Sequence, residues 1–238
     1  TPNCDILGAP IGTPDHCDEW VKSKAIQKTT KLMVHLDKLD AYMLLRYCLS
    51  FSRMVFFLRA IPVDCLLRAC DLFDQAVLQG LQSITYYKFD DNAIIQSSLR
   101  LANGGLGLRK SKQHHPAAYY ASFRQSRDLI CGFTSPLDWN NMPHFVGART
   151  KLSETIPDFK VEDSSTQRDL SARIDLLQKV RLFNSFDGTR NKARLNAVSA
   201  PRASAIFSCF RSSKIGYGLR NVTVARNLGL KLFPKEFP

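Results

Sequence analysis

Three consecutive segments near the start of the chain repeat apolar residues every three or four positions, and this periodicity constrains the fold more than any other feature. The first helix is expected over Pro14–Lys38, with Thr13 as its N-cap and a proline as its first helical residue. The second is expected over Asp40–Pro62 and the third over Asp64–Ile84, each opened by an aspartate that can cap it. Because the links between these helices are very short, the sequence predicts a compact three-helix bundle.

Helical spacing continues beyond this bundle, with interruptions. A short helix begun by Asp90 or Asp91 is expected before a glycine-rich stretch, and a longer helix over 111–133. Residues 133–169 hold prolines and polar clusters without a sustained period, which predicts an irregular linker. Helical spacing then resumes until Pro201. The predicted fold is therefore mainly α: a three-helix bundle followed by a second, smaller helical region. No apolar run approaches the roughly 18 residues of a membrane span, so no transmembrane helix is expected.

The net charge of +12 is concentrated at one end of the 238-residue chain. Residues 1–100 hold eleven Lys/Arg and eleven Asp/Glu, and residues 101–178 hold ten and eight. Residues 179–238 hold twelve basic residues and two acidic ones. A segment with this imbalance repels itself unless an anionic partner is near, so the last quarter of the chain is the candidate binding region.

The cysteine and histidine residues do not form a recognisable metal site. Seven cysteines, an odd number without a CxxC pair, lie mostly in apolar runs, which predicts buried free thiols and a reducing intracellular compartment, nuclear or cytoplasmic. Cys4, His16 and Cys17 could form a zinc site, but their spacing fits no standard ligand pattern. His114 and His115 are adjacent and cannot both face one metal ion from a helix, so they are expected to be surface or capping residues.

The stretch "LRLANGGLGLRKS" (Leu99–Ser111) combines three glycines with apolar and basic residues. A phosphate-binding loop follows a strand and carries a GxGxxG or GxxxxGK[ST] pattern, and this stretch has neither. Its Asn-Gly pair is a strong turn signal, and Leu106 and Leu108 point the same way in an extended segment. The residues therefore predict a tight turn followed by a buried extended segment. Its three glycines are Gly104, Gly105 and Gly107.

No catalytic constellation emerges from the residues themselves. A GxSxG motif is absent, and the adjacent carboxylates Asp90 and Asp91 lie in "KFDDNAI", which is typical of a helix cap. Two-metal phosphoryl transfer needs paired acids held on a rigid framework, and no strand-turn-strand carrying adjacent aspartates is visible.

Several motifs occur in an order that resembles one family. "LGAPIG", "LRYCLSFSRMVFFLRAIP", "CDLFDQAV" and "LRLANGGLGLR" follow one another, and "ARLNAVSAPRASAIFS" and "ARNLGLKLF" come later. Together they resemble the reverse transcriptases of non-LTR (LINE-like) retrotransposons and their domesticated or decayed relatives. The resemblance covers most of the chain except Phe133–Asp169.

The resemblance implies a division of the chain. In that family an "LG.xIG" stretch closes the palm, a helical thumb follows, and a "GGLGLR" segment comes after the thumb. Gly104, Gly105 and Gly107 would then form a structural hinge. The implied segments are 1–12 as the end of a palm-like segment, 13–98 as a thumb-like bundle, 99–132 as glycine hinge and helix, 133–169 as the linker, and 170–238 as a basic helical C-terminal region.

The resemblance also implies what this chain lacks. The family is an RNA-directed DNA polymerase whose catalytic aspartates precede the "LG.xIG" stretch, whereas Asp90 and Asp91 follow the thumb-like segment. The chain begins with Thr1 and has no signal peptide, so it is expected to be a piece of a longer protein. We expect no catalytic residue, metal or cofactor in it. Mg²⁺ would belong to the parent polymerase, and the upstream palm and fingers would be a partner.

A thumb grips a primer-template duplex through cations on phosphates, so basic side chains are the candidate binding residues. The expected partner is RNA, DNA or an RNA–DNA hybrid, and no membrane. The candidates are Arg46, Arg53, Arg59, Arg190, Lys192, Arg194, Arg211, Lys214, Arg220 and Arg226. Two other hypotheses remain open: a helical protein–protein interaction module whose basic face meets an acidic partner, and, with the least support, a complete small enzyme.

Overall fold

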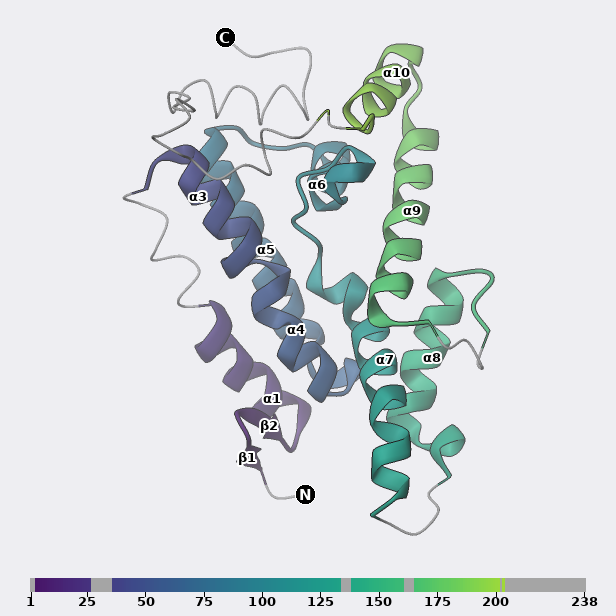
Figure 1. Cartoon of the computed structure of the whole chain (residues 1–238). Helices are drawn as coiled ribbons and strands as arrows, with labels where there is room; N and C mark the ends of the chain where they lie inside the picture. Colours follow the sequence, from purple (N-terminus) through teal and green to yellow (C-terminus); the bar gives the residue numbers. More distant parts are fainter. Residues whose placement is uncertain (1–2, 27–35, 134–137, 161–164, 202, 204–238) are drawn as a thin grey trace, which may run out of the picture. The chain divides into compact units, whose positions relative to one another are not determined.

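The computed structural model describes residues 3–26, 36–133, 138–160, 165–201 and 203 (Figure 1). The fold is mainly α with one small two-stranded hairpin, which confirms the predicted class. The chain divides into two compact units, and each unit is assembled from three separate segments. The sequence instead predicted consecutive domains. Local patterns do not show which distant segments pack together, and this is why the division differs.

Unit 1 comprises Thr1–Ile26, Arg53–Asp74 and Lys110–Ile174. Its elements, some of which continue into unit 2, are β1 (Cys4–Ile6), β2 (Ala9–Ile11), α1 (Pro14–Val21), η1 (Lys22–Ile26), α4 (Phe51–Ala60), η3 (Val63–Cys65), α5 (Leu67–Thr85), α7 (Ser111–Cys131), η5 (Trp139–Asn141), α8 (Pro143–Thr155) and α9 (Gln167–Ser185). Unit 2 comprises Gln27–Ser52, Gln75–Arg109 and Asp175–Pro238. Besides parts of those helices it contains α3 (Lys38–Leu44), η2 (Leu45–Leu49), α6 (Asp91–Ser98), η4 (Leu101–Asn103) and α10 (Thr189–Val198).

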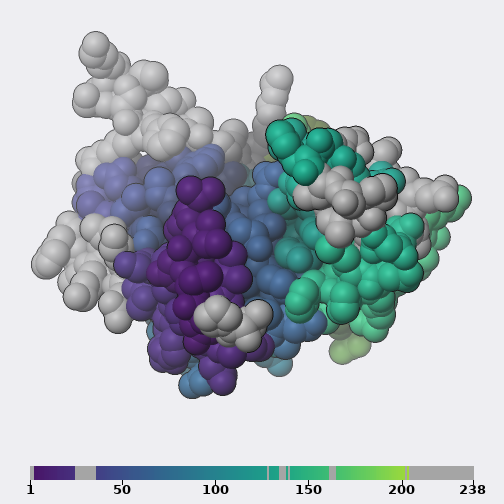
Figure 2. Space-filling view, turned by 90° about the horizontal axis from the view of Figure 1, so that it is seen from below, coloured from purple at the N-terminus to yellow at the C-terminus, as the bar shows by residue number. Residues whose placement is uncertain are grey.

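An antiparallel hairpin and α1 form the N-terminal part of unit 1, drawn in purple in Figure 2. Asp5 pairs with Pro10 in register, and a two-residue turn connects the strands. The α1 helix begins as predicted: the Thr13 hydroxyl accepts a hydrogen bond from the His16 amide, and Pro14 occupies the first helical position. The helix passes into the π-helical turn η1. Residues 27–35 of the predicted Pro14–Lys38 helix lie outside the described residues, and Lys38 already belongs to α3.

The helices α7 and α8 pack side by side in unit 1 (Figure 1). The Tyr120 ring of α7 stacks on the Phe145 ring of α8 with centroids 5.1 Å apart, and Phe123 stacks on the same ring at 4.9 Å. The expectation of irregular structure over 133–169 was therefore wrong for α8, while the linker role of this stretch stays a prediction. Pro143 does not break a helix there, because it lies in the first turn of α8, where its missing amide costs nothing.

His114 and His115 are both buried in the first turns of α7, so the expectation of surface or capping residues was wrong. Both residues are 1% exposed. The His115 Nε2 atom lies 2.9 Å from the carbonyl oxygen of Ile61. Burial lowers the pKa of His115 to about 4, although the hydrogen bond to Ile61 opposes this shift.

The lowered pKa of His115 predicts acid sensitivity. An unfolded histidine gains a proton near pH 6.5, whereas the buried one stays neutral down to about pH 4. The free energy of unfolding should therefore fall as the pH drops through this window, by roughly 3 kcal/mol in total. A His115→Gln variant keeps a donor for Ile61 without titrating, so chemical denaturation from pH 7 to pH 4 should show a flatter profile for it.

Asp74 changes the pH dependence of the free energy of unfolding in the opposite direction to His115. Comparing the wild type with the His115→Gln variant removes this contribution of Asp74. Burial raises the pKa of Asp74 to about 6, although its carboxylate accepts hydrogen bonds from the amides of Ser111 and Lys112 at 2.7 and 3.2 Å. A raised carboxyl pKa contributes stability at low pH that is lost as the pH rises toward 6. Both proteins carry Asp74, so the difference between their pH profiles isolates His115. Identical profiles would contradict the prediction.

The predicted second helix is broken in the middle. It begins at Lys38 with Asp37 as N-cap rather than at Asp40, passes through η2, and bends at Ser50 before α4. The Ser50 backbone leaves the helical region at φ −100° and ψ −139°, and its hydroxyl donates to the Arg46 carbonyl oxygen at 2.8 Å. The predicted third helix, in contrast, starts later than expected, at Leu67, after the turn η3 that contains Asp64.

The stretch Lys38–Ala60 is long and apolar enough to cross a membrane by length and composition alone, and the expectation of no transmembrane helix stays a prediction. It is the one such stretch in the part of the chain that the structure describes. Core helices of soluble proteins meet the same criterion, and 44% of its most apolar window is buried inside the protein. Among its buried residues are Tyr42, Leu45, Leu49, Met54 and Leu58.

A separate apolar cluster joins three elements of unit 2. Leu99, which follows α6, packs with Leu182 of α9, Phe186 and Leu195 of α10. The α6 helix begins at the predicted cap, because the Asp90 carboxylate accepts a hydrogen bond from the Ala93 amide at 2.7 Å. This core holds α10, and with it three of the predicted binding residues, against α6 and α9.

The cysteine expectation is met in part. Cys17, Cys65 and Cys70 are buried free thiols, as predicted. Cys4, Cys48 and Cys131 are free but exposed, contrary to the expectation of burial. Cys209 lies outside the described residues.

Candidate nucleic-acid interface

The glycine stretch is a tightly packed part of unit 2. Gly104 and Gly107 adopt φ values of +83° and +76°, which L residues with a side chain rarely do. A Cβ atom on Gly105 would lie 2.1 Å from the carbonyl oxygen of Leu99. Leu106 and Leu108 are buried, which confirms the predicted turn and buried extended segment. The predicted hinge stays a prediction, and in the structure the glycines serve close packing.

Hydrogen bonds tie this stretch to two helices. The Tyr42 hydroxyl of α3 donates to the Leu106 carbonyl oxygen at 2.8 Å, and the Gln96 side-chain amide of α6 donates to the Gly104 carbonyl oxygen at 2.9 Å. Burial raises the pKa of Tyr42, so its hydroxyl remains protonated and able to donate. The amides of Leu106 and Leu108 both donate to the Ser97 carbonyl oxygen.

A buried ion pair fixes the end of the stretch to α9. The Asp175 side chain is completely buried, and its Oδ2 atom accepts hydrogen bonds from Arg109 Nη2 at 2.5 Å and Arg109 Nε at 3.1 Å. Arg100, nine residues earlier, places its Nε 3.9 Å from the same oxygen. Two arginines of the "LRLANGGLGLR" motif thus neutralise one buried carboxylate, a function that the sequence did not reveal.

Arg46, a predicted binding residue, lies against the glycine stretch. A Cβ atom on Gly107 would come within 2.8 Å of its Nε, and its guanidinium stacks on the Tyr47 ring at 4.6 Å. It is half-buried. One regular helix would place Arg46 and Arg53, seven residues apart, on the same face, but the π-helical turn η2 and the bend at Ser50 interrupt that helix. They also belong to different units.

Arg53 and Arg59 make contacts inside unit 1. Arg53 donates to the carbonyl oxygen of Lys24 at 2.8 Å, and Arg59 donates to the side-chain oxygen of Gln125 at 2.9 Å. Arg59 remains exposed, whereas Arg53 is half-buried.

The three predicted residues on α10 differ in their surroundings. Arg190 is exposed. Lys192 is half-buried, and its ammonium lies 5.6 Å from the centre of the Phe183 ring. Arg194 is half-buried and places Nη2 3.4 Å from the side-chain oxygen of Gln96. Burial lowers the pKa of Arg194, and the nearby Asp90 opposes this. Arg190 and Lys192 therefore present charge to solvent, while Arg194 also supports the glycine stretch through Gln96.

The remaining candidates lie in the C-terminal segment. Arg211, Lys214, Arg220 and Arg226 are outside the described residues. Between Lys179 and Arg194 the described chain holds five basic residues and one exposed acid, Asp187. This described part already has the charge imbalance of the whole last quarter.

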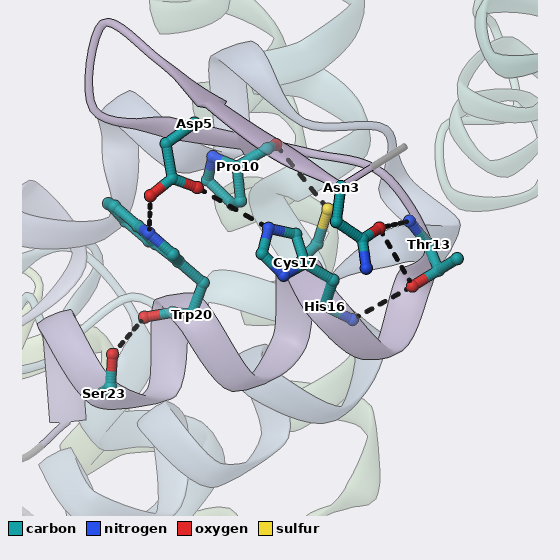
Figure 3. A network of polar contacts seen from close by, with 8 residues as sticks. All are labelled: Asn3, Asp5, Pro10, Thr13, His16, Cys17, Trp20 and Ser23. Carbon is teal, nitrogen blue, oxygen red and sulfur yellow. Dashed lines mark hydrogen bonds and ion pairs between the residues drawn. The ribbon is translucent and has the colours of Figure 1, made fainter. Parts of the chain in front are cut away.

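His16 and Cys17, two of the three residues considered for zinc, take part in a different network, whereas Cys4 is an exposed free thiol (Figure 3). The Asp5 carboxylate accepts a hydrogen bond from Trp20 Nε1 at 2.6 Å and lies 3.6 Å from His16 Nε2. The Cys17 thiol donates to the Pro10 carbonyl oxygen at 3.6 Å. These contacts hold the hairpin on α1. Within the described ranges, no three His, Cys, Asp or Glu side chains are arranged to hold a metal ion.

No family model matches this sequence, and searches of curated proteins and of solved structures find no match.

Proposed function

We propose that this chain is a nucleic-acid-binding piece of a reverse-transcriptase-like protein, comprising a thumb and the region after it, which grips a primer-template duplex. This proposal rests chiefly on the basic excess of residues 179–238, which hold twelve Lys/Arg and two Asp/Glu. The order of the motifs supports the family, and the helical fold is compatible with a thumb.

The proposed binding mode is sequence-independent. Arg190 and Lys192 of α10, with the basic residues that follow, neutralise phosphates of the duplex and release its counterions. An A-form-like RNA–DNA hybrid is recognised through its backbone and shape. The core around Leu99, Leu182 and Leu195 holds α10 in place. Bond formation takes place in the palm of the parent chain, where the resemblance locates the catalytic aspartates and Mg²⁺.

Neutralising the C-terminal cations should weaken binding to a hybrid. A variant with Arg211, Lys214, Arg220 and Arg226 changed to Gln is expected to lose at least roughly tenfold in affinity for a blunt RNA–DNA hybrid at about 0.1 M salt, because fewer counterions are released. The loss should be the same for hybrids of different sequence. Fluorescence anisotropy with a labelled hybrid measures it.

A variant with the same change in charge serves as the control. Arg68, Arg127, Lys160 and Arg168 are exposed and lie in unit 1. Changing these four residues to Gln should leave hybrid affinity within about twofold if binding is confined to the C-terminal region. Equal losses in both variants would show that only total charge matters and would contradict the proposed location.

A second function has one observation in its favour. Leu176 and Val180 lie four residues apart on α9 and are 56% and 48% exposed. An apolar pair beside basic residues fits a helical module that binds an acidic protein partner. In that case hybrid binding would be negligible, even at low salt.

A further inference from the structure

Tyr86 is unusual in both backbone and exposure. It directly follows α5, and its amide donates to the Gln82 carbonyl oxygen at 2.8 Å. Its φ of +58° is a conformation that glycine or asparagine usually adopts after a helix, and a bulky residue is disfavoured there. The side chain is also 78% exposed, so burial does not compensate. The left-handed backbone ends α5, so the large exposed ring is the feature that neither burial nor the helix cap explains.

Lys38 holds a positive charge over the Tyr86 ring. Its ammonium lies 4.2 Å from the ring centre and donates to the Ser83 carbonyl oxygen of α5 at 3.2 Å. The adjacent Tyr87 is half-buried and lies against the Phe89 ring at 6.1 Å. One tyrosine of the pair therefore packs inward, while the other presents its ring to solvent beside a fixed cation.

A second exposed ring in unit 2 has the same arrangement. Tyr47 is 42% exposed, and the Arg46 guanidinium lies 4.6 Å from its ring centre. Proteins that bind single-stranded nucleic acid combine rings that stack on bases with cations that meet the backbone. Stacking does not require a particular base, because every base has a π-face.

We propose that the Tyr86–Lys38 pair is a stacking site for an unpaired nucleobase, with the ring on the base and the lysine close to the adjoining phosphate. This rests on the proposed function and names single-stranded nucleic acid as one substrate of the same unit. Tyr47 with Arg46 offers the same chemistry for another base.

The test uses two variants and two probes. Tyr86→Phe keeps the ring, and Tyr86→Gly removes it while relieving the positive φ. The probes are a short oligothymidylate and an oligomer of equal length whose residues are abasic, so that only the first offers bases. We expect Tyr86→Gly to weaken binding of the oligothymidylate by about 5- to 100-fold and to leave the abasic oligomer unaffected. Tyr86→Phe should bind both like the wild type.

Thermal unfolding separates a binding role from a structural one. Tyr86→Gly should have a Tm no lower than that of the wild type, because glycine suits the left-handed conformation. A lowered Tm with unchanged base-dependent affinity would overturn the proposal and assign the ring to packing. If the wild type and Tyr86→Gly bind both probes with equal affinity, and this binding weakens with salt, the stacking proposal is overturned while the proposed function stands. Failure of the wild type to bind either probe or a hybrid at low salt would overturn both.

Discussion

Replacing Arg109 by methionine should lower the free energy of unfolding by about 3–5 kcal/mol, because the change removes both charge-assisted hydrogen bonds of Arg109 to the buried Asp175 carboxylate. Arg100 reaches the same oxygen only at 3.9 Å and is 40% exposed, so it compensates little. Methionine has a similar length and keeps the apolar packing of the arginine stem. Urea denaturation followed by circular dichroism gives the difference directly.

A double variant distinguishes lost pairing from lost packing. Changing Asp175 to leucine in the Arg109→Met background removes the buried charge as well, and should recover most of the lost stability. Lysine at position 109 should not rescue the protein, because one ammonium cannot reproduce the two donors Nε and Nη2 of the arginine. If the Arg109→Met single variant unfolds at the same urea concentration as the wild type, the ion pair contributes nothing to the stability of the fold.

A Gly105→Ala substitution should lower the free energy of unfolding by more than about 3 kcal/mol, an effect as large as that of Arg109→Met. Its Cβ would meet the Leu99 carbonyl oxygen at 2.1 Å and the Gln96 carbonyl oxygen at 2.5 Å. Both are backbone atoms and cannot rotate away, so α6 or the stretch itself must move, and this disturbs the buried Leu106. The same denaturation experiment measures the loss.

Gly147→Ala is the matched control for this substitution. Gly147 lies inside α8, and its Cβ would have only an ordinary contact, 3.6 Å from an Asp64 carboxylate oxygen. Alanine has a higher helix propensity than glycine, so the free energy of unfolding of this variant should rise by up to about 1 kcal/mol. Similar effects at both glycines would refute the steric explanation.

Local rules predicted the parts of the fold that depend on neighbours in sequence. Thr13 and Asp90 cap their helices as expected, because capping involves residues only three positions apart. The burial of Leu106 and Leu108 followed from their alternation after a turn signal. These features require no knowledge of distant contacts.

The features that the sequence did not reveal depend on tertiary contacts. Asp175 and Arg109 are 66 residues apart, and nothing near either residue signals that they pair. The bend at Ser50 interrupts an otherwise regular helical pattern. The α8 helix was missed because Pro143 suggested a break, although Phe145, Ala148 and Leu152 have helical spacing and are buried.

The candidate interface was predictable mainly through charge. The basic excess of the last quarter is visible in composition, but the different surroundings of Arg190, Lys192 and Arg194 depend on how α10 packs. The sequence could not distinguish the exposed Tyr86 from its neighbour Tyr87, which has the same side chain and packs inward, so only the structure reveals it.

The most direct test of nucleic-acid binding is the salt dependence of the association constant of the unmodified chain for an RNA–DNA hybrid. Each neutralised phosphate contributes about 0.9 to the slope of log K against log salt for a B-form duplex. Contact with four or more phosphates therefore predicts a slope of about −3.6 or steeper. A slope near zero, or no binding at low salt, would contradict the account.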